Sequence, residues 1–155
     1  MYPMKNQFFL GFLLACLCSS LLGLGQDPLI KQKIATKPVL FSKLPQKSLC
    51  KRSELDKLAR STKFVNISIQ LNENLLLSGE LIEKVQAAEG IQNLNFRLSN
   101  FGNALLTLSI VKQTDNTTKM VGRLIHPKHG DALVIAEENG NYYITKHKME
   151  FFMVE

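Results

Sequence analysis

A two-residue hydrophobic period beyond residue 64 constrains the fold of the chain more than any other feature. Apolar and polar residues alternate over residues 65–72, again over 93–99 and again over 106–110. Because successive side chains of a β-strand point to opposite faces, each of these segments can bury one face and leave the other in water. We therefore predict that most of the domain consists of half-buried strands.

The clearest local signal is a hairpin centred on Asn139-Gly140. This dipeptide favours a two-residue turn with positive φ, because the twist of that turn matches the twist of the flanking strands. In the resulting register, Ile135 faces Ile144 across the hairpin. The pattern therefore predicts one strand on either side of the turn.

Two segments require a choice between helix and strand. Residues 53–59 begin with Ser-Glu-Leu-Asp, which has the form of a capping box, and they place Leu55 and Leu58 on one face. We predict a short helix there. Residues 75–85 fit either structure, but Gly79 is unfavourable inside a helix and strands are expected on both sides. We predict a strand for this segment.

Together these segments predict an all-β fold class, with a short helix ahead of the strands. About seven short strands follow one another at roughly ten-residue spacing, which is typical of an antiparallel sandwich or a small open barrel. Residues 149–155 can add a further, edge-like segment. Parallel strands need long crossover connections, and the connections here are short, so a parallel sheet is excluded.

The N-terminus has the anatomy of a secretory signal peptide. Lys5 precedes an uncharged run over residues 8–24, and Gly23 and Gly25 provide small residues at its exit. We predict that residues 1–25 are a signal peptide. The protein is then secreted or held in the cell envelope, in the periplasm or at the surface.

Two alternatives to cleavage after Gly25 also lead to export. Leu13-Leu14-Ala15-Cys16 resembles the bacterial lipobox, which makes Cys16 a lipidation candidate and the N-terminus a possible membrane tether. Cleavage after Gly25 is favoured, because the chain stays apolar beyond Cys16. The apolar run of 17 residues also reaches the lower end of the range of about 17–25 for a membrane-spanning helix, so an uncleaved anchor is the third outcome.

Charge and proline divide the rest of the chain. Residues 31–63 hold ten basic and two acidic residues, a net charge of +8, whereas residues 64–155 have a net charge of −2. Residues 26–47 contain three prolines and are predicted to form a basic extended linker, and residues 48–155 a single β-rich domain. The basic charge is confined to this leader and the chain has no Trp, so we exclude nucleic acid as a partner.

One cluster has the residue types of a metal site. His126, His129 and Asp131 lie within six positions of one another, and His147 can join them from a neighbouring strand. The intervening proline and glycine also fit a turn, in which Asp131 accepts hydrogen bonds from nearby backbone N–H groups. Structural metal sites usually show tighter, repeated spacing, so we favour the turn and predict no metal.

Signatures of catalysis are absent from the sequence. The HExxH and GxSxG motifs and the phosphate-binding glycine loop do not occur. We therefore predict no enzyme activity, no catalytic residue and no cofactor. Beyond the signal the chain has one cysteine, Cys50, which we predict to be a small buried apolar side chain.

The segment 120–144 combines a glycine within a strand, a Gly-polar turn, an apolar strand, and a glycine turn before a Tyr-x-Ile strand. These places are taken by Gly122, Gly130-Asp131, residues 133–135, Gly140 and residues 142–144. The arrangement resembles the non-catalytic β domain that precedes the catalytic domain of some secreted bacterial metallopeptidases. The chain has no peptidase domain, so the resemblance implies a free-standing accessory or partner-binding domain. It also implies Cys50 as a thiol that blocks the zinc of a separate peptidase.

The sequence thus favours an exported, non-catalytic binding or structural domain that presents a β surface to a protein or envelope partner. Two alternatives belong to other classes of function. One is a metal-binding protein that uses His126, His129 and Asp131. The other is a propeptide-like inhibitor that acts on a secreted peptidase through Cys50.

Overall fold

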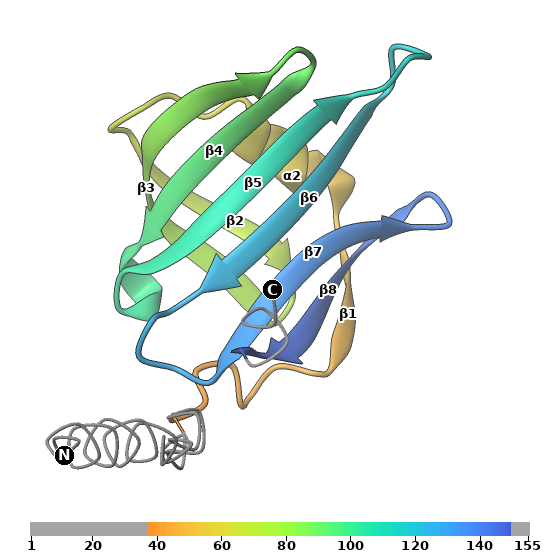
Figure 1. The fold of residues 1–155 in the computed structure, drawn as a ribbon. Helices are drawn as coiled ribbons and strands as arrows, with labels where there is room; N and C mark the ends of the chain where they lie inside the picture. Colours follow the sequence, from red (N-terminus) through yellow and green to blue (C-terminus); the bar gives the residue numbers. More distant parts are fainter. Residues whose placement is uncertain (1–36, 150–155) are drawn as a thin grey trace, which may run out of the picture. The chain divides into compact units, whose positions relative to one another are not determined.

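A computed structural model describes residues 37–149 as one antiparallel β-structure (Figure 1). In chain order its elements are β1 (Lys47–Cys50), α2 (Arg52–Ala59), β2 (Asn66–Asn72), β3 (Leu75–Ala88), β4 (Ile91–Leu98), η3 (Ser99–Phe101), β5 (Ala104–Lys112), β6 (Thr118–Ile125), β7 (Asp131–Glu138) and β8 (Asn141–Lys148). The predicted signal peptide with Cys16, the start of the predicted linker and residues 150–155 lie outside the described residues.

The eight strands belong to one sheet in the order β1-β8-β7-β6-β5-β4-β3-β2. Strands β2 to β8 therefore form a continuous antiparallel meander, and β1 pairs with the last strand. The two outer strands in this order, β1 and β2, approach each other. There the Lys51 N–H donates to the Leu71 carbonyl at 3.2 Å, and the Asn72 side-chain amide donates to the Ser48 hydroxyl at 3.0 Å. The sheet thus forms a nearly closed barrel, which confirms the predicted all-β class.

Large apolar side chains fill the inside of this barrel. Alternate residues of neighbouring strands point inward and are fully buried, among them Leu77, Leu81, Leu94, Phe96, Leu106 and Leu108. Helix α2 packs against β2 and adds Leu55 and Leu58 to the same core. The burial of these side chains is the main source of stability for a fold that has no disulfide within residues 37–149.

Most predicted elements are confirmed. The ambiguous residues 75–85 lie in strand β3, and the hairpin turn has positive φ at Asn139 (50°) and Gly140 (79°). Ile135 pairs with Ile144, as the turn type requires. The prediction of a capping box at Ser53, in contrast, was wrong. Helix α2 directly follows β1, so the extended Lys51 is its N-cap, and no side chain caps the helix.

The predicted boundary of the linker was also wrong for its final residues. Phe41 is 1% exposed and lies in the core, where its ring centroid is 5.5 Å from that of Phe101. Lys47 begins strand β1. The packed domain therefore starts well before residue 48, because a buried aromatic ring and a strand both come from the stretch predicted to be a linker. In residues 37–149, no helix is long and apolar enough to cross a bilayer.

Candidate functional site

Strands β6 and β7 pair over part of their length and then diverge, as Figure 1 shows. Their ladder has four residue pairs, and Gly122–Ile135 is the pair nearest the point of separation. A Cβ atom added to Gly122 would lie 3.0 Å from Ile135 Cδ1. A larger residue at position 122 would therefore crowd the side chain of Ile135 where the two strands still pair.

Two side chains replace the missing ladder beyond this point. The Met120 N–H donates to the Tyr142 hydroxyl at 3.0 Å, and the Arg52 guanidinium donates to the Thr118 carbonyl at 3.2 Å. Burial is the main cause that raises the pKa of the Tyr142 phenol, which therefore stays neutral. These contacts satisfy backbone groups of β6 that have no partner on β7, so the gap is sealed without further strand pairing.

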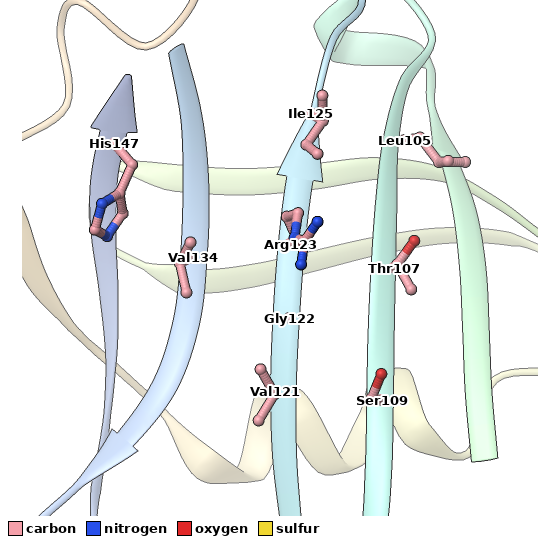
Figure 2. A pocket seen from close by; sticks show the side chains of 9 residues that line it. All are labelled: Leu105, Thr107, Ser109, Val121, Gly122, Arg123, Ile125, Val134 and His147. Carbon is pink, nitrogen blue, oxygen red and sulfur yellow. The ribbon is translucent and has the colours of Figure 1, made fainter. Parts of the chain in front are cut away.

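A shallow hollow of about 500 Å³ lies on the outer face of the sheet, over β5, β6, β7 and β8 (Figure 2). We call it the outer hollow. Its lining residues are Leu105, Thr107, Ser109, Val121, Gly122, Arg123, Ile125, Val134 and His147. Apart from Gly122, these side chains come from the positions that alternate with the buried residues, so the same alternation that builds the core also builds the hollow.

The register explains the chemistry of the outer hollow. Thr107 pairs with Arg123, and Arg123 pairs with Val134, so one cation lies in the middle of the row. Leu105 and Val121 rise from β5 and β6 and are 42% and 44% exposed. The lining also contains small and β-branched side chains, namely Thr107, Ser109 and Val134. The result is a concave apolar surface around a guanidinium group, with the imidazole of His147 at its β8 side (Figure 2).

The hydroxyl and imidazole groups of the outer hollow are too far apart to act together. Ser109 is on β5 and His147 is on β8, and two strands separate them. Neighbouring strands lie about 4.8 Å apart, so these side chains start from backbones about 14 Å apart. A nucleophile and its base must be within hydrogen-bond reach. The arrangement therefore suits binding rather than acyl transfer by this pair.

The predicted His126 cluster is a turn held together by hydrogen bonds. The ring of His126 contacts the Gly102 carbonyl through Nε2 at 3.0 Å, which requires a proton on that nitrogen. Its Nδ1 then accepts from the Lys128 N–H at 3.1 Å and from His129 Nδ1 at 2.8 Å. Both nitrogens of His126 are thus occupied, one by the turn before β5 and the other within the connection between β6 and β7.

Asp131 has a different role from the one predicted for it. Its two carboxylate oxygens accept from the N–H groups of Leu40 and Phe41, at 2.7 and 2.8 Å. These donors are about ninety residues away in sequence, not in the same turn as predicted. The buried carboxylate therefore anchors the segment before β1 to the barrel and holds Phe41 in the core.

The four candidate metal ligands do not converge. His126 and His129 touch each other, the carboxylate of Asp131 is bound to the segment before β1, and His147 lines the outer hollow. Within residues 37–149, no group of three His, Cys, Asp or Glu side chains is placed to hold a metal ion. The geometry thus gives no support to the metal-binding alternative.

The thiol of Cys50 is buried, with 3% of the residue exposed. Burial, and to a smaller extent the nearby carboxylate of Glu54, raises its pKa to about 12. The thiolate, which is the form that binds zinc, is therefore strongly disfavoured at neutral pH. This environment speaks against Cys50 as the active group of an inhibitor.

The outer hollow and Arg123 were missed by the sequence reasoning. A signal for them was present, because the otherwise polar side of the segments that form β5 and β6 also contains Leu105, Val121 and Ile125. Apolar residues on both sides of a strand in an antiparallel sheet indicate that the outer side is also covered or bound.

Comparisons with models of protein families, with curated proteins and with solved structures found no match to this chain. The resemblance of residues 120–144 to the β domain of secreted metallopeptidases therefore stays a prediction.

Proposed function

We propose that this chain is an exported, non-catalytic binding domain that receives a protein partner in its outer hollow. One observation carries the proposal: a concave apolar surface around Arg123 lies on the outside of a barrel whose inside is packed. The buried centre of a protein interface is more apolar than the rest of the surface, and arginine is enriched among the residues that contribute most to binding.

The position of the outer hollow supports a macromolecular partner. It extends over four strands and is open to solvent, with Leu105 and Val121 standing at its rim. The inward faces of the same strands are occupied by large side chains such as Leu106 and Leu124. A partner that lies across the outer face can bury the exposed apolar side chains without any change in the core.

Export is supported by residues 1–25, in which a basic residue, an apolar run and small residues at the exit follow one another as in a signal peptide. Cleavage after Gly25 gives a free domain, whereas lipidation at Cys16 gives a domain tethered to a membrane. The intact mass of the protein from its natural host distinguishes the two. A mass that retains residues 1–25 without lipid would argue for an uncleaved anchor.

Photo-crosslinking in the native host tests the binding surface. The photoreactive residue p-benzoylphenylalanine replaces Leu105 in one variant and Leu76 in its control. The control is closely matched, because both leucines point outward from a strand and both are 42% exposed, but Leu76 lies on β3 outside the outer hollow. We expect one discrete protein adduct from position 105 and none from position 76.

Equal adducts from both positions, or none from position 105, would contradict the proposal. Val121 and Val85 form a second matched pair, with 44% and 41% exposure.

The non-catalytic part of the proposal has its own test. Hydrolysis of a broad panel of peptides and esters by the purified chain, above the rate of a denatured control, would overturn it.

A further inference from the structure

The connection that leads from α2 to β2 (Figure 1) contains a strained residue. Within residues 37–149, four residues other than glycine have positive φ, and three of them are asparagines, which tolerate this conformation. The fourth is Phe64, with a φ of 61°. A bulky side chain is rarely found in this conformation, and such strain persists where the surrounding structure fixes it, often at a functional site. We call residues 60–65 the basic loop.

Backbone hydrogen bonds fix the basic loop. The Ser61 N–H donates to the Leu58 carbonyl at 3.0 Å, and the Phe64 N–H donates to the Leu81 carbonyl of β3 at 2.9 Å. The ring nevertheless stays out of the core, because Phe64 is 76% exposed and the next residue, Val65, is 52% exposed. A fixed backbone thus holds two neighbouring apolar side chains in water.

Two cations flank this apolar pair. Arg60 is the C-cap of α2, Lys63 directly precedes Phe64, and both are exposed. Within residues 37–149, neither of their side chains forms a hydrogen bond or an ion pair. Residues 51–65 as a whole hold five basic and two acidic residues, a net charge of +3.

The carboxylates of the neighbouring elements leave these two cations unpaired. On α2, Glu54 forms its ion pair with Lys57 at 2.8 Å. On β3, Glu83 accepts from the side-chain amide of Asn95 at 2.6 Å, and Glu80 lies opposite the first residue of β2. The basic loop therefore presents two apolar side chains and two unpaired cations to solvent.

We propose that the basic loop binds an anionic membrane surface and inserts Phe64 and Val65 at the level of the lipid headgroups. Segments that bind there combine apolar side chains, which enter the interface, with basic side chains, which stay beside the anionic headgroups. The unpaired cations favour this occupant over a protein. A protein would have to place carboxylates at matching positions, whereas an anionic bilayer offers negative charge along its whole surface. The proposal goes beyond the outer hollow and does not depend on it.

A tryptophan at position 64 tests insertion directly, because the chain contains no Trp and the new side chain is the only such fluorophore. The full chain with Phe64→Trp is mixed with vesicles of phosphatidylcholine and phosphatidylglycerol in equal parts. We expect its emission to shift to shorter wavelength and to be quenched by brominated acyl chains, since the indole leaves water.

Val39→Trp is the control for insertion. Val39 is 55% exposed, close to the 52% of Val65, and the neighbouring Pro38 carbonyl accepts from the Gly130 N–H between β6 and β7. In the antiparallel order of the strands, that connection is at the end of the barrel opposite to the start of β2. Residues 1–36 are the same in both chains, so attachment through them does not separate the two. We expect no shift for Val39→Trp.

Charge reversal tests the role of the cations. Adding Arg60→Glu and Lys63→Glu to the Phe64→Trp chain should weaken the interaction of the tryptophan with the vesicles by about tenfold or more. The control reverses two exposed cations outside the basic loop, Lys43→Glu with Lys128→Glu, and should weaken it by less than about threefold. Equal effects of the two pairs would contradict a specific role for the basic loop.

Phe64→Gly tests whether the ring serves the fold instead. Glycine adopts positive φ freely, so this substitution should relieve the strain and leave the urea midpoint unchanged or raised. A lower midpoint would show that the ring supports the fold and would contradict the proposal.

Two further results would overturn membrane insertion. One is equal shifts from positions 64 and 39, or a shift from neither. The other is a discrete protein crosslinked to p-benzoylphenylalanine at position 64 in the native host, with no shift on vesicles, which would identify a protein as the occupant. Neither result affects the outer hollow, which is tested separately by crosslinking from position 105.

Discussion

The inner and outer faces of strands β5 to β8 are built from neighbouring residues, yet they have different roles. Leu106 points into the barrel and is fully buried, whereas Leu105 points outward and stands at the rim of the outer hollow. The inner face is packed to exclude water, and the outer face keeps apolar groups accessible around Arg123. One strand can thus supply stability through one residue and the proposed binding surface through the next.

The two faces also have different structural requirements. The inner face is defined by burial alone, and almost any large apolar side chain of suitable shape satisfies it. The outer face depends on the lateral arrangement of the strands, because the row from Thr107 through Arg123 to Val134 requires correct pairing of β5, β6 and β7. Substitutions at neighbouring positions therefore separate stability from binding.

The largest expected effect comes from the neighbouring leucines themselves. Leu106→Ala should lower the free energy of unfolding by about 2–5 kcal/mol, because it removes buried methyl groups and leaves a cavity. Leu105→Ala should lower it by less than about 1 kcal/mol. Urea denaturation of both variants measures the difference. Equal losses of stability would show that the two faces are not distinct.

The second effect concerns the carboxylate of Asp131, which anchors the segment before β1 and holds Phe41 in the core. Asp131→Ala removes the acceptor of two N–H groups and should cost about 3 kcal/mol, since it loses two hydrogen bonds to a charged group, each at the lower end of the range of about 1.5–3 kcal/mol. Asp131→Asn retains one acceptor oxygen and should cost less. Denaturation, with amide hydrogen exchange at Leu40 and Phe41, checks this. Unchanged exchange at these amides in Asp131→Ala would argue against the anchor.

A smaller effect is expected where β6 and β7 diverge. Tyr142→Phe keeps the buried ring but removes the hydroxyl that accepts from Met120, at a cost of about 1–2 kcal/mol. Hydrogen exchange of the Met120 amide should accelerate more than that of the neighbouring Leu124 amide. If both amides respond equally, the hydroxyl does not seal the gap in the ladder.

The smallest effect appears only at high pH. Burial raises the pKa of Cys50 from 9.0 to about 12, so the thiol stays neutral in the folded chain while it ionises in the unfolded chain. Its contribution to stability is therefore complete below pH 9 and decreases between pH 9 and about 12. The difference in unfolding free energy between the unchanged chain and Cys50→Ala, measured across this range, should shrink as pH rises. A constant difference would contradict the burial of the thiol.

The local part of the fold could be predicted from the sequence. Strand periodicity and the Asn139-Gly140 turn depend on neighbouring residues, and both were confirmed. Strand β1 was missed because it has four residues and pairs with β8, almost a hundred residues away. The anchor of Asp131 was assigned to the wrong donors for the same reason. Its true partners come close only when the barrel has formed.

The outer hollow could not be predicted in the same way. It requires Thr107, Arg123 and Val134 to lie side by side on three strands, and this depends on the register of β6 against β7. That register lasts for four pairs before the strands separate, which no local pattern indicates. The apolar residues stand in the sequence, but the surface that they share forms only when the strands are paired.

Binding of the partner to chains with a charge placed on the outer face tests the central claim most directly. Once crosslinking has identified the partner, calorimetry compares Leu105→Glu with Leu76→Glu, two substitutions at equal exposure. We predict that Leu105→Glu weakens binding by about tenfold or more, or about 1.4 kcal/mol, and that Leu76→Glu leaves it within about twofold. Equal affinities of the two variants would show that the partner does not bind in the outer hollow.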